Sequence, residues 1–439
     1  MNGFDRYCLA TIIRGIYINA TGTSWIVLYQ PPGDPGQPAE DGAEFSPDVI
    51  WVDISSALAN DDFDEEVAAK IFTEAFAAWE FERAPSGVEA LEKTATVKKL
   101  PSRVVVKNRN RIAAFYWIDR SIDAAKERIS QGRETLFEIP LSAPPREPSG
   151  RDHALAPGMS AALRGEVVKD RIALVTGGAQ GFGEEIVRGL AASGALVFIA
   201  DLNLGGAEKL AAGINAAAKK TAAIPVAVNV SDEASVEELF RTVAETAGGL
   251  DLCISNAGVL RAGSVLEQDL GEFKFVTDIN YTGFFIVAKH AGRLFRRQHR
   301  TAPNWKTDII QINSKSGLEG SNKNGAYAGG KFGGIGLTAS FALELVEYNI
   351  KVNAICPGNF FDGPLWSDPE KGLFVQYLKA GKVARAKTVA DVKAFYESKV
   401  PMKRGCTGAD VMRAIYYIVE QEYETGQAIP VTGGQVMLH

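Results

Sequence analysis

The stretch that decides the fold reads TGGAQGFG and spans residues 176–183. The apolar run Arg171–Thr176 leads into it, and a helix-like pattern, Glu184–Ala192, follows at once. Glycines at such a turn let the backbone approach a pyrophosphate closely, where a Cβ atom would collide. The helix that follows directs its first N–H groups at the phosphates. The stretch therefore predicts a dinucleotide-binding turn between a strand and a helix.

Strand and helix patterns alternate along the rest of the chain after this turn. This alternation predicts an α/β fold with a doubly wound parallel sheet of the Rossmann type. The strands are predicted at Arg171–Thr176, Leu196–Ala200, Pro225–Val230, Leu252–Ser255, Asp308–Ser314 and Lys351–Cys356. The helices are predicted at Glu184–Ala192, Ala207–Ala217, Ala234–Thr246, Asn280–Arg297 and Tyr327–Tyr348.

The part before residue 141 has a different pattern and predicts a smaller α+β domain over residues 1–140. A Pro, Ser and Gly-rich linker is expected at 141–163, and the nucleotide-binding and catalytic domain at 164–439. The apolar stripe of Glu65–Arg83 predicts a helix, and a second is expected after Asp119. The strands of this domain are predicted at Thr11–Asn19, Trp25–Tyr29, Val49–Ile54, Arg103–Lys107 and Ala113–Ile118.

Composition narrows the class of protein. The chain has 439 residues, 46% of them hydrophobic, and a formal net charge of −6, which argues against binding to nucleic acid or to an anionic membrane. The four cysteines are scattered and indicate free thiols in a reducing compartment. Charged residues interrupt the first turn of the chain, and no apolar run is long enough to span a bilayer. We therefore expect a cytoplasmic protein.

An acidic residue predicts which dinucleotide binds. Asp201 ends the second strand, where its carboxylate can accept hydrogen bonds from both adenosine ribose hydroxyls and would repel a 2′-phosphate. The turn carries Gln180 and no Lys or Arg that would balance such a phosphate. These residues favour NAD over NADP. The alternative is that Asp201 merely caps a loop.

The pair Tyr327 and Lys331 is the candidate for proton transfer. The two stand four residues apart and so share one helix face. A phenol titrates near about pH 10, and a neighbouring ammonium and the positive charge of an oxidised nicotinamide both favour phenolate. This pair alone is common in proteins. It gains specificity from Ser314 at the end of a strand, from Asn256-Ala257-Gly258 after an earlier strand, and from Asn280 at a helix start.

Together with the glycine turn, these motifs resemble the successive signatures of the short-chain dehydrogenase/reductase family. The resemblance covers about residues 164–439 and includes the final Val431-Thr432-Gly433-Gly434. It implies that Tyr327 is the general acid/base, that Ser314 binds the substrate oxygen and that Lys331 holds the nicotinamide ribose. Asn280 would keep a water molecule that relays protons. Ser316 is the rival for the serine role, but a turn serine bonding local backbone fits it better.

The same resemblance supplies a set of cofactor-binding residues. Asn229 stands where the family usually has Asp beside the adenine, and Asp362 stands where it commonly has a threonine for the carboxamide. How the carboxamide is held therefore stays open. The expected cofactor-binding residues are Thr176, Gly177, Gln180, Gly181, Phe182, Gly183, Asp201, Asn229, Val230, Asn256, Ala257, Gly258, Tyr327, Lys331, Pro357 and Gly358.

Some stretches resemble a subgroup of the family that acts on polyol phosphates. They are Ile312–Gly317, Lys331–Thr338, Gly358-Asn359, Val400–Cys406 and Thr432–Met437. The resemblance implies interconversion of a polyol phosphate and a ketose phosphate, with sorbitol 6-phosphate and fructose 6-phosphate as the expected pair. At least one of Lys315, Lys403 and Arg404 is expected to contact the phosphate, and solvated surface charge is the alternative for each.

The segment 363–399 is long for a loop of this fold. Its Leu365, Trp366, Phe374 and Tyr377 either cover the bound substrate as a lid or pack against the sheet or a neighbouring subunit. A homo-oligomer is expected, a tetramer or a dimer, built partly on the long helices near Asn280 and Tyr327.

Other functions stay open at this point. One is a short-chain dehydrogenase for another alcohol, such as a free polyol or an oxoacyl thioester; another is a non-catalytic nucleotide-binding protein. No metal site is expected, and residues 1–150 contain no histidine, which excludes a histidine-liganded aldolase site there. No family can be named for residues 1–140, and their role stays open.

Overall fold

The computed structural model describes residues 3–30, 49–54, 57, 63–82, 97–101, 103–108, 111–131, 136–140, 165–370, 372–379, 381 and 383–437. The chain forms two compact units. The first comprises Met1–Ser160, Arg241–Leu250 and Leu294–Trp305. The second comprises Ala161–Phe240, Asp251–Arg293 and Lys306–His439. The linker predicted at 141–163 lies outside the described residues, so the domain boundaries stay a prediction.

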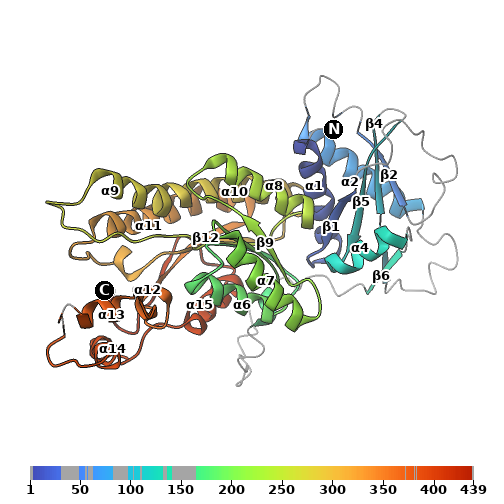
Figure 1. The fold of residues 1–439 in the computed structure, drawn as a ribbon. Helices are drawn as coiled ribbons and strands as arrows, with labels where there is room; N and C mark the ends of the chain where they lie inside the picture. The colour runs from blue at the N-terminus through green and yellow to red at the C-terminus, as the bar shows by residue number, and fades with distance from the viewer. Residues whose placement is uncertain are drawn as a thin grey trace, which may run out of the picture. The chain divides into compact units, whose positions relative to one another are not determined.

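A seven-stranded parallel sheet forms the centre of the second unit (Figure 1). Its spatial order is β13-β12-β11-β10-β7-β8-β9, and all neighbouring strands run parallel. This confirms the predicted α/β fold. The strands are β7 Ile172–Thr176, β8 Leu196–Asp201, β9 Ala223–Ala227, β10 Leu252–Ser255, β11 Thr307–Ile312, β12 Ile350–Pro357 and β13 Ala428–Val431.

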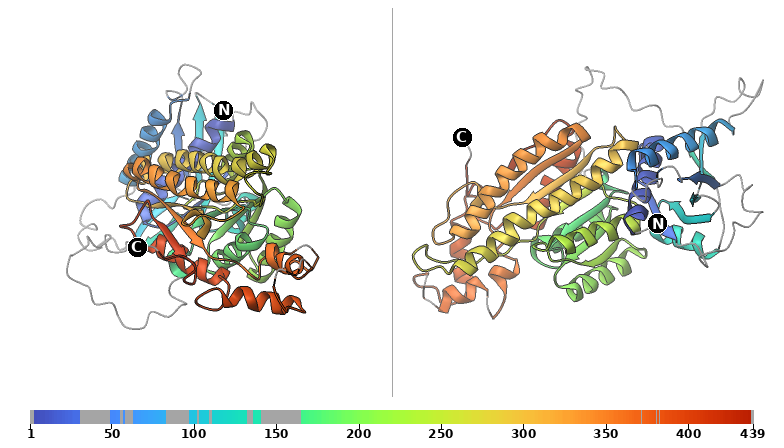
Figure 2. Two further views of the ribbon diagram at one scale, coloured as in Figure 1. Left: turned by 90° about the vertical axis from the view of Figure 1, so that its left-hand side faces the viewer. Right: turned by 90° about the horizontal axis from the view of Figure 1, so that it is seen from above.

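Helices cover both faces of this sheet, as buried β7, β10, β11 and β12 require. Figure 1 shows α6, α7 and α15 on one face and α9, α10 and α11 on the other, and in Figure 2 α10 and α11 run alongside each other. No helix within the described ranges is long and apolar enough to cross a bilayer. The main helices are α6 Gly181–Ala192, α7 Leu204–Ala218, α8 Glu233–Ala247, α9 Leu270–Thr277, α10 Gly283–Thr301, α11 Gly325–Leu345 and α15 Gly408–Glu420.

The order of strands fixes where a ligand binds. From β7 the chain continues to β8 and β9 on one side, and then returns to β10, β11 and β12 on the other side. Loops leaving the carboxyl ends of β7 and β10 therefore diverge and leave a crevice between them. The glycine turn follows β7, and Asn256-Ala257-Gly258 follows β10.

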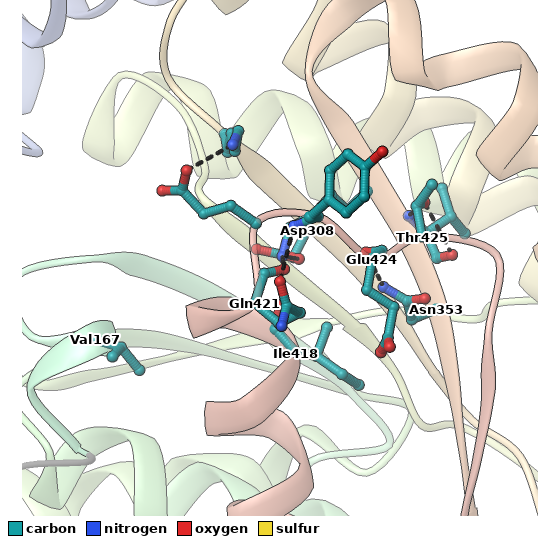
Figure 3. Close-up of polar contacts among 12 residues, drawn as sticks. Val167, Asp308, Asn353, Ile418, Gln421, Glu424 and Thr425 are labelled. Carbon is teal, nitrogen blue, oxygen red and sulfur yellow. Dashed lines mark hydrogen bonds and ion pairs between the residues drawn. The ribbon is translucent and has the colours of Figure 1, made fainter. Parts of the chain in front are cut away.

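The opposite, amino edge of the sheet is held by a buried ion pair (Figure 3). Lys351 Nζ, at the start of β12, lies 3.0 Å from Asp308 Oδ1 at the start of β11. The same ammonium donates to the carbonyls of Ile418 and Gln421, so it also holds the end of α15. Asn353 Nδ2 donates to Glu424 O in the next turn. A buried charge needs this many partners because water is absent there.

The first unit has a four-stranded sheet of order β1-β5-β4-β2, with a separate pair of strands, β3 and β6. Helices α1 Gly3–Thr21 and α2 Glu65–Glu82 share one apolar core with this sheet. The remaining elements are β1 Ile26–Gln30, β2 Val49–Asp53, β3 Val97–Pro101, β4 Arg103–Asn108, β5 Arg111–Asp119, α4 Ile122–Gln131 and β6 Leu136–Pro140.

One predicted strand of this unit is wrong. Thr11–Asn19 lies inside helix α1. Its β-branched residues favour a strand on propensity, and the side chains from Tyr7 to Ile18 are all buried, so no polar face marks the helical period. Burial overrides the local preference here.

Candidate active site

Three of the four glycines of the turn after β7 show different purposes. Gly177 has φ +61°, and a Cβ atom there would lie 2.8 Å from Ala257 Cα. A Cβ on Gly183 would lie 1.9 Å from Gly177 O, so this glycine allows α6 to pack onto the turn. Gly181 has φ +60° and faces open space, its nearest neighbour being Pro364 at 4.0 Å. The turn thus has the close backbone and the free volume that a pyrophosphate requires.

Asp201 binds the turn and also borders the crevice. Its carboxylate accepts hydrogen bonds from Ala179 N (2.9 Å) and from Asn203 N (2.8 Å). Each carboxylate oxygen can accept more than one hydrogen bond, so both keep capacity for a ribose hydroxyl. The loop-capping alternative and the ribose-binding prediction are therefore compatible.

Thr176 and Asn256 join the ends of β7 and β10. Thr176 Oγ1 accepts from Asn256 N (3.0 Å) and Ala257 N (3.1 Å). Asn256 Nδ2 donates to Thr176 O (3.0 Å) and Gly177 O (2.9 Å). Thr176 is fully buried, so it supports the backbone of Asn256 and Ala257 from the interior and does not face the cavity.

Asn280 has a similar positioning role. It lies in a short π-helix, Asp278–Thr282, that precedes α10; such π-turns occur often at functional sites. Its side chain accepts from Val259 N (2.8 Å) and donates to Val259 O (2.7 Å). These bonds hold the loop after β10. The water-relay role that the family resemblance implies for Asn280 stays a prediction.

Ser314 and Tyr327 meet at the carboxyl end of β11. Ser314 Oγ accepts a hydrogen bond from Ser316 N (3.1 Å), and Ser316 is mostly buried but also lines the cavity described below. Burial raises the pKa of Tyr327, and the hydrogen bond from Ser314 offsets part of that rise. The sequence predicted that Lys331 would lower this pKa, but in the structure burial outweighs any such effect. Desolvation of a phenolate is the physical reason.

Lys331 lies one helical turn after Tyr327. Its Nζ donates to Ile312 O at 2.9 Å and lies 5.6 Å from the centre of the Tyr327 ring. Burial lowers the pKa of Lys331 to about 8. The ammonium is therefore held close beneath the ring, between the end of β11 and α11.

One cavity of about 1110 Å³ connects the glycine turn, Asp201, Ser314 and Tyr327. Six predicted residues do not line it: Thr176, Gly183, Asn280 and Lys331, which lie behind its wall, and Lys403 and Arg404. The predicted residues that line it are Gly177, Gln180, Gly181, Phe182, Asp201, Asn229, Val230, Asn256, Ala257, Gly258, Ser314, Lys315, Tyr327, Pro357 and Gly358. The motifs found along the sequence thus share one site.

Comparison with known proteins agrees with this geometry. The short chain dehydrogenase family profile matches residues 171–366. Sorbitol-6-phosphate 2-dehydrogenase of Escherichia coli is 37% identical over 270 residues, which are 61% of this chain and 99% of that protein. The chain belongs to the short-chain dehydrogenase/reductase family.

Solved structures of the family agree in fold. The sorbitol-6-phosphate 2-dehydrogenase of Erwinia amylovora is 40% identical, with a TM-score of 0.55, over 61% of this chain and all of that one. An actinorhodin polyketide ketoreductase solved with NADPH is 26% identical, with a TM-score of 0.52, over 60% of this chain and 97% of that one. This dehydrogenase is therefore an oxidoreductase of a family that uses nicotinamide cofactors.

The acidic and basic residues that line the cavity of the dehydrogenase lie in different parts of it. Among the described lining residues, Asp201 is the acidic one, beside the glycine turn, and Lys315 and Lys323 are the basic ones. Lys315 follows Ser314 directly, and Lys323 lies in the loop before α11. Sequence analysis missed Lys323; its place shortly before the Tyr327 helix is the signal that was available.

The other predicted cations point elsewhere. Lys403 Nζ donates to Ser398 O at 2.7 Å, and Arg404 makes two hydrogen bonds to the carboxylate of Asp410. Neither lines the cavity, so the prediction that they contact the substrate phosphate loses its support. Their place after the Pro357-Gly358 turn gave no information on side-chain direction.

Asp362 also turns away from the cavity. Its Oδ1 lies 2.5 Å from Lys393 Nζ, and Asn359 and Phe360 form the cavity wall in its place. At the position where the family commonly has a threonine, this chain thus has an aspartate that forms an ion pair with Lys393. Asn359 is a polar residue of the same loop that does line the cavity.

Two short helices line the cavity, α12 Pro364–Ser367 and α13 Leu373–Lys379, and a third, α14 Val389–Ser398, packs against α13 (Figure 1). Leu365, Trp366 and Tyr377 line it from this side. Trp366 also packs on Phe361 and Phe374, in an apolar cluster separate from that of the sheet. Segment 363–399 thus has its own small core and presents apolar side chains to the cavity.

The raised pKa of Tyr327 predicts a pH dependence. With Tyr327 as the predicted general base, alcohol oxidation needs its phenolate, whose small fraction at neutral pH grows about tenfold per pH unit below the pKa. We expect kcat/KM for oxidation to rise steadily from about pH 7 to about pH 9, and kcat/KM for ketone reduction, which needs the phenol, to stay flat between about pH 6 and pH 8. Initial rates in both directions measure this, and a flat oxidation profile would contradict it.

Proposed function

We propose that this chain is an NAD-dependent dehydrogenase that interconverts a polyol phosphate and a ketose phosphate, with sorbitol 6-phosphate and fructose 6-phosphate as the pair. One observation carries the proposal: the two basic side chains that line the cavity, Lys315 and Lys323. Neither makes an ion pair with any residue that the structure describes. Free cations beside a catalytic serine and tyrosine suit an anionic substrate. The two sorbitol-6-phosphate 2-dehydrogenases among the relatives support the same substrate.

The choice of NAD rests on the other end of the cavity. Asp201 is the charged residue there, and neither Gln180 nor the described lining residues around it supply a cation for a 2′-phosphate. A carboxylate that accepts from ribose hydroxyls repels that phosphate at close range.

The residues around Tyr327 have compatible roles in the reaction. The substrate hydroxyl binds Ser314 Oγ and Tyr327 Oη, and in oxidation its proton passes to the Tyr327 phenolate. Lys331, held by Ile312 O, keeps a positive charge under the ring while it is protonated. A bound nicotinamide would supply the acceptor for the hydride of the carbon atom that carries this hydroxyl.

A direct assay tests the proposal. The purified chain is mixed with NAD and sorbitol 6-phosphate, and the absorbance of NADH is followed beside the same mixture with free sorbitol. We expect turnover of the phosphorylated polyol with a much higher kcat/KM. A panel that includes other polyols and an oxoacyl thioester with NADH covers the alternative substrates. Cofactor binding without turnover of any of them would favour a non-catalytic role.

We also propose that the chain assembles with copies of itself, as a tetramer or a dimer. Large apolar side chains are exposed on three helices that cover the same face of the parallel sheet: Leu270, Phe273 and Phe275 on α9, Phe285 on α10, and Phe332 and Leu343 on α11. Such a cluster on neighbouring helices is typical of a subunit interface. Light scattering should give a multiple of the 47.1 kDa chain mass, and Leu343→Glu should lower it. A wild-type monomer would contradict the proposal. A cytoplasmic location stays a prediction.

A further inference from the structure

The loop before α11, residues 321–324, has an unusual backbone. Lys323 has φ +54°, the left-handed region that favours glycine and asparagine over lysine. Gly263 N donates to Lys323 O at 2.9 Å, and Gly263 and Asn324 form an isolated β-bridge. The loop is thus held against the segment after β10. A lysine kept in an unfavourable conformation beside a reaction site is a reason to ask what its side chain binds.

Asn324, the next residue, has a buried polar atom without a partner. It lines the cavity and is 9% exposed. Its Oδ1 has no hydrogen bond within the described part of the chain. Asparagine immediately before a helix normally caps the first turn, but this side chain makes no such bond to α11. Leaving a buried amide oxygen unpaired is costly. A ligand hydroxyl that donates to Oδ1 would remove that cost, and the Nδ2 of the same amide can donate to a phosphate oxygen.

The start of α11 adds a third feature. The first N–H groups of a helix have no acceptor within it, and none of the described side chains caps α11. A Cβ atom on Gly325 would meet nothing within 4 Å, so space is open at the first turn. Helix N–H groups, the positive end of a 21-residue helix and the Lys323 ammonium together favour an anion.

We propose that Lys323, Asn324 and the first turn of α11 form the subsite that binds the phosphate group of the substrate. This inference rests on the proposed function and assigns one place to the phosphate. Tyr327 lies on the same helical turn. The start of α11 thus supplies both the side chain that takes up the substrate proton and the subsite for the phosphate at the other end of the substrate. Lys315, beside Ser314, lies at the reacting end of the cavity.

The test removes the cation without straining the loop. Asparagine tolerates the left-handed region, so Lys323→Asn keeps the backbone and loses the charge. Lys403 offers a matched control, since it is also left-handed, with φ +59°, and lies outside the cavity. We expect Lys323→Asn to raise KM for sorbitol 6-phosphate by about 10- to 100-fold, the loss of a charge-assisted contact, with kcat little changed. Lys323→Arg should restore most of the affinity, and Lys403→Asn should change neither parameter.

Free sorbitol gives the second comparison. Its KM should differ by less than about twofold between the wild type and Lys323→Asn, because it has no phosphate to lose. The proposed subsite is overturned if Lys323→Asn raises KM equally for both substrates, or if Lys403→Asn raises KM for sorbitol 6-phosphate as much as Lys323→Asn does.

A binding measurement separates this inference from the proposed function. If the wild type does not oxidise sorbitol 6-phosphate, the proposed function fails by itself. Inorganic phosphate is then titrated into the NADH complex, whose fluorescence reports binding beside the nicotinamide. Saturable binding that is lost in Lys323→Asn and kept in Lys403→Asn supports the subsite. No binding to the wild type, or equal binding to both variants, overturns it.

Discussion

Tyr327→Phe lowers kcat/KM for alcohol oxidation by about 10³-fold, within the range that general acid–base groups contribute, and leaves NADH affinity nearly unchanged. The variant keeps the ring against Lys331 and removes one hydroxyl, the atom that meets Ser314. The loss should fall on kcat, since the hydroxyl acts mainly as the proton moves.

Stopped-time NADH assays measure kcat/KM for alcohol oxidation, and a fluorescence titration measures the affinity for NADH. Tyr423→Phe is the matched control, because Tyr423 is fully exposed and lies outside the cavity. A Tyr327→Phe enzyme that keeps a tenth of its activity would contradict the assignment. A large loss of NADH affinity would show instead that the substitution disturbs the cofactor site.

Asp201→Asn combined with Leu202→Arg should reverse the cofactor preference. The asparagine removes the repulsion of a 2′-phosphate and keeps an oxygen that accepts from the backbone, as Asp201 does with Ala179 N. Leu202 is 78% exposed and lines the cavity beside it, so an arginine there can pair with that phosphate. We expect kcat/KM to fall about 100-fold with NAD and to rise about 10-fold or more with NADP, about 1.4 kcal/mol per decade.

The single variants show which charge matters. Asp201→Asn alone should weaken NAD and relieve the exclusion of NADP, and Leu202→Arg alone should change little while the carboxylate remains. A wild type that already uses NADP as well as NAD would refute the proposed role of Asp201. Kinetics with each cofactor at a saturating alcohol concentration decide between these outcomes.

The fold of the second unit could be predicted because its strands are buried on both faces. Strands such as β7 and β11 are buried throughout, and helices such as α6 and α10 carry clear signals in their amphipathic faces. Thr11–Asn19 was misassigned because a helix buried all round has no such face. The β9 strand lies earlier than predicted, at Ala223–Ala227, since Val228 and Val230 extend the apolar pattern beyond the last pairing.

The site could be predicted as far as backbone motifs determine it. Glycines, Ser314, Tyr327 and Asp201 have fixed places relative to strand ends, so order along the chain predicts that they meet in space. Long side chains are different. Arg404 binds Asp410, Asp362 binds Lys393, and Lys323 lines the cavity; these places depend on the neighbours that the folded chain brings to each side chain. A motif places a lysine on a loop and does not determine which way it turns.

The buried pair Lys351–Asp308 lies at one end of β11 and β12, and the cavity lies at the other end of the same strands. Both strands begin at this pair. The carboxyl end of β11 leads to Ser314 and that of β12 to the Pro357-Gly358 turn, where the cavity lies. We therefore expect substitutions at the buried pair to lower stability, and substitutions just past the carboxyl ends of these strands to lower turnover. In a deep mutational scan, defects in yield and defects in rate should divide along the length of each strand, at positions only a few residues apart.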